Sequence, residues 1–211
     1  MEKKKNISMA VIKRLPKYHR YLQELMRNDI DRISSKDLGE KIGFTASQIR
    51  QDLNCFGDFG QQGYGYNVKD LYNQISLILG LNKDYKTVIV GAGNIGQAIA
   101  NYSRFAELGL FLKGIFDANP KMTGLRMMGI EIQDIDNMES FLQGNDIDIA
   151  MICVPRINAQ KVCDILVAGG VKGIWNFAPV DLVVPEDVIV ENVHLSESLL
   201  TLIYLLHKGE E

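Results

Sequence analysis

The spacing of apolar residues divides this chain of 211 residues into a helical front and a rear in which strands and helices alternate. In the front, apolar side chains recur every three or four residues from Met9 to Asn28. This period predicts a helix, and Pro16 predicts a break in it.

Two short helices are predicted next, one directly after the other. Ser34-Ser35-Lys36-Asp37 is an N-terminal capping sequence, and it opens a helix that ends at Gly43. Thr45 and Gln48 form a Thr-x-x-Gln capping box that opens a second helix over residues 46–54. Two short helices joined by a tight turn have the outline of a helix-turn-helix.

The second of these helices has two different faces. Its apolar residues fall on one side, and four polar residues fall within a quarter to a third of a turn on the other side. The polar residues are Ser47, Arg50, Gln51 and Asn54. Arginine can read guanine, and glutamine or asparagine can read adenine, so this face fits base recognition. An ordinary solvated polar face is the alternative; the helix-turn-helix outline and the local basic charge favour DNA recognition.

Residues 56–66 contain four glycines and four aromatic residues, a composition that predicts a tight hairpin. After a helix-turn-helix such a hairpin is a wing, with Gln61-Gln62-Gly63 at its tip and Tyr64 beside it. Glutamine at the tip can donate to the minor-groove acceptors of A·T pairs. A plain surface hairpin is the alternative. Asn67 then caps a helix over 68–81 that closes the front domain.

The rear begins with a dinucleotide-binding fingerprint. A buried strand over 87–90 runs into Gly91-Ala92-Gly93-Asn94-Ile95-Gly96 and a helix over 97–102, and Asp117 ends the next apolar run. The first glycine permits the tight turn, the second lets the backbone approach a pyrophosphate, and the third lets helix and strand pack closely. The helix N-terminus attracts phosphate. Asp117 can accept from both ribose hydroxyls and would repel a 2′-phosphate, so the pattern favours NAD(H) over NADP(H).

Further strands and helices alternate behind the fingerprint. Strands are predicted over 127–132, 147–154, 173–177 and 188–193, and helices over 137–143 and 157–168. In a doubly wound sheet the ligand lies outside the carboxyl ends of the strands. The residues placed there, at the nicotinamide half of the site, are Val154, Pro155, Asn176, Phe177, Ala178 and Pro179. For Phe177, simple core packing is the alternative.

The last predicted helix, over 195–206, is apolar almost all round. Such a helix must be covered on more than one side, which a single protomer does not readily provide. A homodimer satisfies this requirement, and a helix-turn-helix that reads a palindromic site also needs one.

These patterns together predict an α/β protein in three parts. Residues 1–82 form a winged helix-turn-helix DNA-binding domain, residues 83–193 a Rossmann-type domain with a doubly wound parallel sheet, and residues 194–211 a dimerisation helix.

Charge and cysteine content refine this picture. Residues 1–80 carry 13 lysines and arginines against 9 acidic residues, whereas residues 81–211 carry 10 against 17. A basic front on an acidic chain indicates a nucleic-acid surface, with a solvated charged face as the alternative. The chain shows no signal peptide and no membrane-length apolar run, and its three cysteines lack metal-binding spacing. We therefore expect a cytoplasmic protein with reduced thiols, no metal and no membrane partner.

An NAD-dependent enzyme would need a catalytic acid or base beside the nicotinamide and a substrate pocket. Of the three histidines, only His194 lies near the rear site in sequence, and no Ser-Tyr-x-x-x-Lys set is present. The rear segment leaves little chain for a substrate domain, so a sensor is favoured. An NAD(P)-dependent oxidoreductase and a CoA- or other nucleotide-binding module with an accessory domain remain the alternatives.

The chain as a whole resembles the Rex family of redox-sensing transcriptional repressors. The resemblance is carried by residues 7–16, 45–53, 59–66 and 176–179 together with the mid-chain fingerprint. It implies a homodimer that senses the NADH/NAD⁺ ratio and binds palindromic, A/T-rich operators when NADH is low. It further implies that NADH releases the DNA and that the C-terminal helix is swapped between protomers.

The resemblance also implies roles for single residues. Arg14 and Arg20 match family arginines near the DNA and the domain interface, and Tyr102 matches a tyrosine close to the nicotinamide. With the residues above, the expected DNA-binding set is Arg14, Thr45, Ser47, Gln48, Arg50, Gln51, Asn54, Gln61, Gln62, Gly63 and Tyr64.

Three positions differ from the family pattern. Gln51 stands where some members carry a lysine, which indicates adenine rather than guanine readout. Gln62 stands where some carry a basic wing residue, which predicts a weaker grip on DNA. His194 stands where some carry an aspartate that pairs with the arginine matching Arg20, and Glu197 is the alternative partner for that arginine.

Overall fold

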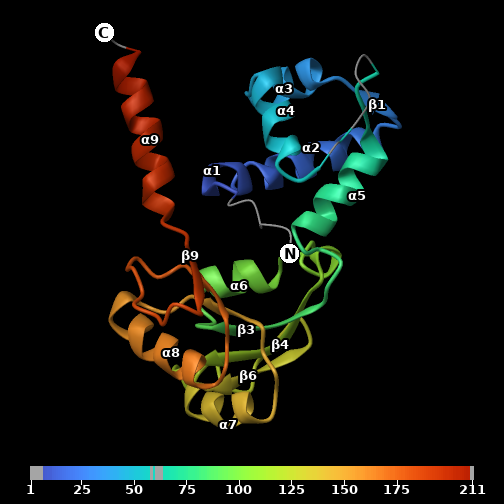
Figure 1. The fold of residues 1–211 in the computed structure, drawn as a ribbon. Helices are drawn as coiled ribbons and strands as arrows, with labels where there is room; N and C mark the ends of the chain where they lie inside the picture. The colour runs from blue at the N-terminus through green and yellow to red at the C-terminus, as the bar shows by residue number, and fades with distance from the viewer. Residues whose placement is uncertain (1–6, 58, 60–63, 210–211) are drawn as a thin grey trace. The chain divides into compact units, whose positions relative to one another are not determined.

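The computed structural model describes residues 7–57, 59 and 64–209. The chain divides into two compact units, Met1–Lys83 and Asp84–Glu211 (Figure 1). Each has its own buried apolar core.

The first unit is built mainly from helices. These are α1 (Met9–Ile12), α2 (Leu15–Arg27), α3 (Ser35–Ile42), α4 (Ala46–Asn54) and α5 (Val68–Ile78), and a two-stranded sheet pairs β1 (Arg32–Ile33) with β2 (Tyr66–Asn67). The core lies among α2, α3, α4 and α5. Its fully buried side chains include Tyr18, Leu22, Leu38, Ile49, Leu53 and Ile75.

The predicted caps form in the structure. The Ser34 hydroxyl accepts from the backbone N–H of Asp37 at 3.1 Å, and the Thr45 hydroxyl accepts from that of Gln48 at 3.1 Å. Asn67 caps α5 in the same way. Each cap satisfies a backbone donor that the first turn of a helix leaves without a partner, so helix starts are readable from sequence here.

The prediction of a helix break at Pro16 was wrong by a few residues. The break lies between α1 and α2, at Lys13 and Arg14, and Pro16 belongs to the first turn of α2. Proline costs little there because the N–H that it lacks would have no intrahelical partner. The helix predicted over 68–81 also ends earlier, at Ile78.

The two-stranded sheet was not predicted in this form. Tyr66–Asn67 pairs antiparallel with Arg32–Ile33, a strand that precedes the helix-turn-helix. The tip predicted for the wing, Gln61-Gln62-Gly63, lies outside the described residues. Tyr64, which follows it, is exposed.

The second unit is organised around a seven-stranded sheet. Its strands are β3 (Tyr85–Val90), β4 (Leu110–Asp117), β5 (Arg126–Met127), β6 (Ile130–Asp134), β7 (Ile149–Ile152), β8 (Gly173–Asn176) and β9 (Ile189–Asn192). They lie in the order β5-β6-β4-β3-β7-β8-β9, and of the described pairs only β5–β6 is antiparallel. The chain starts in the middle at β3 and winds outward in both directions, which confirms the predicted doubly wound sheet.

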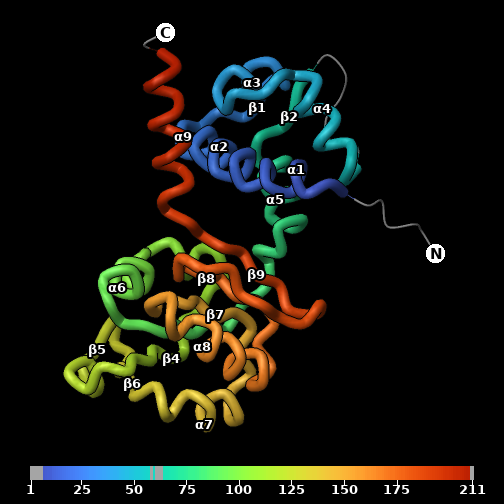
Figure 2. The backbone as a smooth tube through the Cα atoms, turned by 90° about the vertical axis from the view of Figure 1, so that its left-hand side faces the viewer, coloured from blue at the N-terminus to red at the C-terminus, as the bar shows by residue number. Residues whose placement is uncertain are grey.

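Helices cover both faces of this sheet. α6 (Asn94–Ala100) lies on one face, and α7 (Met138–Gln143) and α8 (Arg156–Ala168) lie on the other (Figures 1 and 2). Successive side chains of β3 point to opposite faces of the sheet and so contribute to both helix layers. Val88 and Val90 belong to the core shared with α7 and α8, whereas Ile89 belongs to the core shared with α6.

One predicted strand proved to be two. Residues 127–132 contain the turn of a hairpin between β5 and β6, and its central residues, Met128 and Gly129, both have positive φ (51° and 79°). Turns of this kind usually carry Asn-Gly or Asp-Gly, and methionine seldom adopts positive φ. The sequence Met128-Gly129 therefore gave no signal of a turn.

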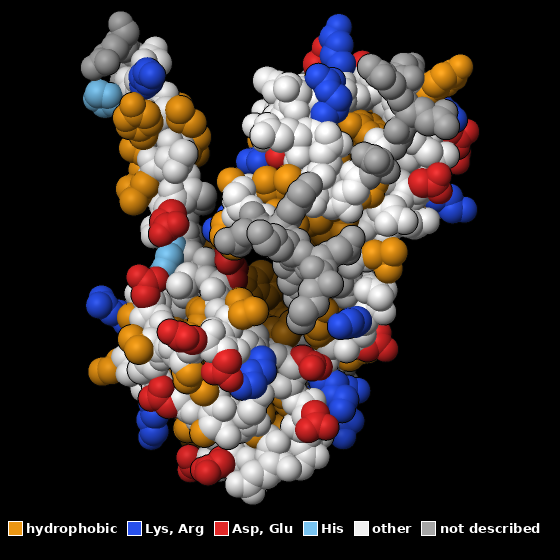
Figure 3. All heavy atoms as spheres, in the orientation of Figure 1, with side chains coloured by type: hydrophobic (Ala, Val, Ile, Leu, Met, Phe, Trp, Pro, Cys, Tyr) orange, Lys and Arg blue, Asp and Glu red, His pale blue; other side chains and the backbone are white. Residues whose placement is uncertain are grey.

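The last helix, α9 (Leu195–Lys208), contributes no buried residue to the chain. Figure 3 shows apolar side chains gathered along it. These are Leu195, Leu199, Leu200, Leu202, Ile203, Tyr204, Leu205 and Leu206, each 51–65% exposed. In the part of the chain that the structure describes, no helix has the length and apolar character required to cross a bilayer.

Candidate nucleotide site and DNA-binding surface

The glycine turn between β3 and α6 is dictated by close backbone contacts. A Cβ on Gly91 would lie 2.6 Å from the carbonyl oxygen of Cys153, and Gly91 has a φ of 101°. A Cβ on Gly96 would lie 1.9 Å from the carbonyl oxygen of Gly91. Beyond the adjacent residues, no atom lies within 4 Å of a Cβ placed on Gly93. The first and third glycines are therefore required by packing, whereas the second faces open space that a ligand can enter.

Asp117 at the end of β4 holds this turn in place. One of its carboxylate oxygens accepts from the backbone N–H of Ala92 at 2.6 Å, and the other accepts from that of Asn119 at 2.7 Å. Each oxygen keeps a further lone pair for a ribose hydroxyl. The sequence predicted only the ribose contact, and the bond to Ala92 is a second, structural use of the same carboxylate.

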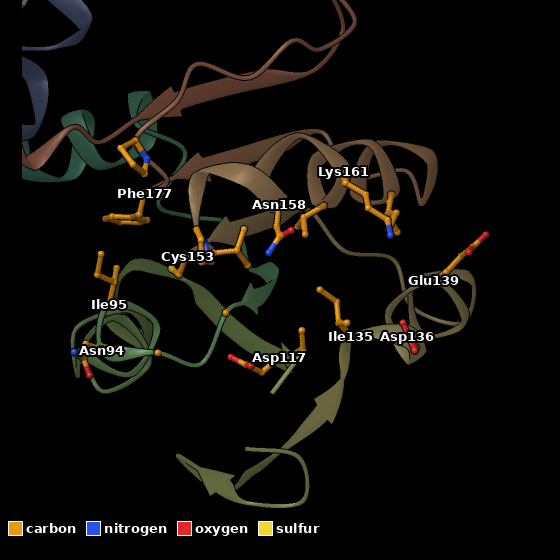
Figure 4. Close-up of a pocket in the computed structure, with 18 residues that line it drawn as sticks. Asn94, Ile95, Asp117, Ile135, Asp136, Glu139, Cys153, Asn158, Lys161 and Phe177 are labelled. Atoms are coloured by element: carbon orange, nitrogen blue, oxygen red, sulfur yellow. The ribbon is translucent and has the colours of Figure 1, made fainter. Parts of the chain in front are cut away.

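A cavity of about 740 Å³ opens beside the turn, at the carboxyl ends of the strands (Figure 4). It lies within the size range of small-molecule and cofactor sites. Its lining combines the fingerprint, the end of β7, the start of α8 and the turn after β8. The lining residues are Gly91, Gly93, Asn94, Ile95, Asp117, Ala118, Ile135, Asp136, Glu139, Cys153, Val154, Pro155, Asn158, Lys161, Val162, Ile165, Phe177 and Pro179.

The two ends of the cavity differ in character. Ile95, Cys153 and Phe177 lie toward one end, whereas Asp136 and Glu139 lie toward the other (Figure 4). Burial raises the pKa of the Cys153 thiol to about 12, so it stays protonated and behaves as an apolar group at neutral pH. The cavity therefore offers an apolar end and a charged end.

The structure separates the predicted nicotinamide residues into two groups. Val154, Pro155, Phe177 and Pro179 line the cavity. Asn176 is fully buried, and its side chain donates to the carbonyl of Val180 at 2.7 Å and accepts from the N–H of Ala178 at 3.0 Å. Asn176 and Ala178, which is also buried, thus fix the shape of the turn that presents Phe177 and Pro179.

Tyr102 is absent from the cavity lining and lies just after α6. Its ring packs 5.0 Å from that of Phe105, which in turn contacts Trp175 at 6.1 Å between ring centroids. Trp175 lies 4.6 Å from Phe177. These four rings form a continuous row from an exposed tyrosine to the cavity. The sequence did not predict this row of rings, because the aromatic residues come from separate segments of the chain.

Several lining residues were not anticipated from the sequence. They lie on α8, on α7 or just before α7, and they are Asp136, Glu139, Asn158 and Lys161. Their positions depend on how the helices pack across the sheet, which the local sequence pattern does not contain.

In the first unit, α4 presents the predicted polar face. Ser47, Arg50, Gln51 and Asn54 are all exposed, whereas Ile49 and Leu53 are buried. The guanidinium of Arg50 donates to the hydroxyl of Ser35 on α3 at 2.9 Å, which steadies the arginine at the surface. The face is therefore available to a partner.

Three residues of the first unit converge on a buried carboxylate that sequence reasoning overlooked. Asp52 on α4 is fully buried, and it receives hydrogen bonds from Arg14, Tyr18 and Gln48. We call these four residues the Asp52 cluster. Gln48 was predicted to complete a capping box, but its side chain donates to Asp52 instead.

The electrostatics of the Asp52 cluster follow from this geometry. Burial on its own would raise the pKa of Asp52, but the hydrogen bonds from Arg14, Tyr18 and Gln48 outweigh it and hold the pKa below its ordinary value. The hydrogen bond to Asp52 raises the pKa of Arg14. Burial, followed by the bond to Asp52, raises the pKa of Tyr18. The pair is thus a charged carboxylate and a charged guanidinium.

Other predicted groups occupy separate places. His194 precedes α9, and its Nε2 lies 3.4 Å from a carboxylate oxygen of Asp181. The pairing of Arg20 with His194 or Glu197 stays a prediction. Within residues 7–57, 59 and 64–209, no group of three or more histidine, cysteine or acidic side chains is arranged to hold a metal ion.

Comparison with known proteins gives a consistent result. Residues 6–54 match a family model described as a putative DNA-binding protein N-terminus, and residues 82–180 match one described as a CoA binding domain. The redox-sensing transcriptional repressor Rex of Clostridium perfringens (strain SM101 / Type A) is 74% identical over 210 residues, which cover 100% of this chain and 99% of the relative. That of Clostridium beijerinckii is 73% identical and covers 100% of both chains.

Solved structures agree with these sequence matches. The crystal structure of RSP in complex with β-NAD⁺ and operator DNA is similar with a TM-score of 0.92 at 60% identity, covering 98% of this chain and 95% of that chain. The crystal structure of RSP in complex with β-NADH has a TM-score of 0.91 at 57% identity, covering 98% and 97%.

Proposed function

The chain belongs to the Rex family of redox-sensing transcriptional repressors, and we propose that it is itself a DNA-binding repressor that senses the NADH/NAD⁺ ratio. The main support for the proposal is that the same chain contains both a Rossmann cavity and a helix-turn-helix with an exposed polar face. In this reading, NADH in the cavity releases the operator.

The cavity favours NAD(H) among adenine nucleotides. Its charged end contains the carboxylates of Asp136 and Glu139 and the basic residue Lys161, and the carboxylate of Asp117 lies between the two ends (Figure 4). The 2′-phosphate of NADP(H) and the 3′-phosphate of CoA would each meet this acidic surface. The match to a CoA binding domain therefore describes the fold of residues 82–180, and we propose NAD(H) as the ligand.

The residues that would contact the nicotinamide also favour a sensor, in which the nucleotide binds and leaves unchanged, over an enzyme that consumes it. The apolar end holds Ile95, Cys153 and Phe177, and the protonated Cys153 thiol offers no base at neutral pH. General acid–base catalysis needs a group that exchanges a proton near the operating pH. We infer that the bound nucleotide is read and not turned over.

The direction of the response follows from the charge of the nicotinamide ring. The oxidised ring is a cation and the reduced ring is neutral, so the apolar end of the cavity accepts NADH at lower desolvation cost. NADH releases DNA only if it binds the DNA-free arrangement better than the DNA-bound arrangement. An arrangement that closes apolar groups over the ring meets this condition.

A homodimer is part of the proposal. The eight apolar residues of α9 are all exposed in the single chain, and such a surface requires a cover. A second copy provides one if each chain lays its α9 against the other, which is a swapped helix. Two helix-turn-helix units then face a palindromic operator, with Ser47, Arg50, Gln51 and Asn54 as the proposed reading residues and the wing residues 61–64 as minor-groove contacts.

A regulator of this kind acts on chromosomal DNA, so we place it in the cytoplasm.

A parallel titration tests the proposal. The full-length chain is bound to a labelled duplex carrying the operator from the RSP complex, and NADH, NAD⁺, NADPH and CoA are added separately while fluorescence anisotropy is recorded. We expect NADH to release the duplex at much lower concentration than the other three. Equal release by NADH and NAD⁺ would contradict redox sensing. Release by CoA alone would favour the CoA-binding alternative, and steady oxidation of NADH would favour an enzyme.

A further inference from the structure

We propose that Arg14 and Asp52 are positioning residues that set the rotation of α4 and thereby aim its reading side chains, without Arg14 contacting DNA itself. The inference rests on the proposed function, because it concerns how an operator is read. It gives Arg14 a different task from the DNA contact that the family resemblance implies.

The geometry around Asp52 uses the full capacity of its carboxylate. One oxygen accepts from Arg14 Nε at 2.5 Å and from Tyr18 Oη at 2.6 Å. The other accepts from Arg14 Nη2 at 2.7 Å and from Gln48 Nε2 at 2.8 Å. Arg14 is thus a two-pronged donor, and four donors satisfy one buried carboxylate. The Arg14 side chain is 19% exposed and that of Asp52 is 0% exposed.

The cluster ties together separate elements of the helix-turn-helix unit. Arg14 lies at the start of α2, Tyr18 lies within α2, and Gln48 and Asp52 lie on α4. The ring of Phe44, in the turn between α3 and α4, packs 6.1 Å from that of Tyr18 and lies 5.8 Å from the Arg14 guanidinium. Asp52 therefore fixes α4 to α2 from the side opposite the reading face.

Hydrogen bonds are needed here because apolar packing alone tolerates small rotations. Ile49 and Leu53 bury α4, but hydrophobic contacts are not directional. Side-chain tips on a helix lie about 5–6 Å from its axis, so a rotation of about 20° moves them by about 2 Å. That shift exceeds the spread of normal hydrogen-bond lengths and would misalign Arg50 and Gln51 with base edges.

The charge of the pair separates this role from a phosphate contact. Arg14 and Asp52 neutralise each other, so together they add nothing to the counterions that DNA binding releases. The logarithm of DNA affinity falls linearly with the logarithm of salt concentration, and we call the steepness of this line the salt slope. Losing a phosphate contact weakens binding to every sequence and lowers the salt slope by about one. Losing a positioning pair weakens binding to the operator alone and leaves the slope unchanged.

The experiment compares two duplexes, the operator from the RSP complex and the same bases in scrambled order, at several salt concentrations. The variants of the full-length protein are Arg14→Gln, Arg14→Lys and the double variant Arg14→Gln/Asp52→Asn. The double variant removes both charges, so it leaves no unpaired buried charge and protects against simple unfolding. Lys17→Gln is the matched control, because Lys17 lies 5.2 Å from the same Phe44 ring and the loss of its charge spares the carboxylate.

We expect the three Arg14 variants to bind the operator about tenfold or more weakly and the scrambled duplex within about threefold of wild type, with an unchanged salt slope for Arg14→Lys and for the double variant, which keep the net charge. Arg14→Lys should not restore operator affinity, because lysine keeps the positive charge but cannot donate to both carboxylate oxygens as the guanidinium does. Lys17→Gln should keep the ratio of the two affinities, and NADH affinity should be unchanged throughout.

Two results would overturn the inference. An equal loss on both duplexes with a slope lower by about one would make Arg14 a phosphate contact. Wild-type discrimination in the folded double variant would remove the pair from the reading mechanism. A wild-type protein that itself shows no preference for the operator would overturn the proposed function, and this inference with it, so the two failures are distinguishable.

Discussion

A methyl group added at Gly93 should weaken NADH sensing while leaving the fold and DNA binding intact. The backbone at Gly93 has a φ of −71°, which alanine adopts readily, and no atom beyond the adjacent residues lies within 4 Å of the new Cβ. A glycine-to-alanine change at such a site stabilises a protein by about 0.4–1 kcal/mol through the unfolded state. The thermal midpoint of Gly93→Ala should therefore equal or slightly exceed that of wild type.

The same methyl group stands where the fingerprint predicts the approach of the pyrophosphate. Displacing the phosphate from even one backbone N–H costs about 1.5–3 kcal/mol, the value of a hydrogen bond to a charged group. NADH should therefore bind about ten- to a hundredfold more weakly. The variant should hold its operator at NADH concentrations that release the wild type.

The assay combines three measurements on one sample. Trp175 is the single tryptophan of the chain and contacts Phe177 at the cavity, so its fluorescence reports NADH binding directly. Anisotropy of a labelled operator reports release, and calorimetry gives the thermal midpoint. Gly96→Ala is the matched control, because its Cβ would lie 1.9 Å from the Gly91 carbonyl oxygen and should lower the midpoint. Wild-type NADH affinity in folded Gly93→Ala would refute the placement of the pyrophosphate.

Three further predictions concern the other parts of the chain. Arg50→Ala should weaken operator binding by about 1–3 kcal/mol in anisotropy titrations and leave NADH affinity unchanged; a loss of NADH affinity would contradict the separation of the two sites. Replacing Leu199 and Ile203 by aspartate should convert a dimer to a monomer in sedimentation experiments, and a dimer of unchanged strength would remove α9 from the interface. Because the folded pKa of Asp52 is lowered, its contribution to the free energy of unfolding should be complete above about pH 4 and lost as the pH falls through the folded value. Asp52→Asn should flatten that acid dependence in urea unfolding, and an unchanged profile would show that the carboxylate is not the responsible group.

The sequence was sufficient for features that depend on local chemistry. The caps at Ser34, Thr45 and Asn67 were readable because the capping oxygen and its N–H partner lie three residues apart. The glycine turn was readable because the fingerprint contains the residues that its geometry requires. The alternation of strands and helices then predicted the doubly wound sheet.

Features that depend on distant segments were not readable. The pairing of Arg32–Ile33 with Tyr66–Asn67 joins strands on either side of the helix-turn-helix, and each is only two residues long. Asp52 sits among polar residues that mostly face outward, and its burial becomes visible only when Arg14, far from it in sequence, is placed beside it. The charged end of the cavity likewise depends on packing across the sheet.

The energetics of the proposed switch indicate where its free energy arises. Moving a two-state equilibrium from 1:99 to 99:1 requires a differential affinity of about 5.5 kcal/mol, shared in a homodimer between two bound nucleotides. Covering one leucine side chain contributes roughly 1.5–3 kcal/mol. All eight apolar residues of α9 are exposed in the single chain, so two dimer arrangements that differ by about one or two covered side chains for each helix would differ in free energy by a comparable amount. We infer that the cover of α9 sets the equilibrium between the two arrangements in the absence of ligand, whereas the nucleotide shifts that equilibrium only by the difference between its affinities for them.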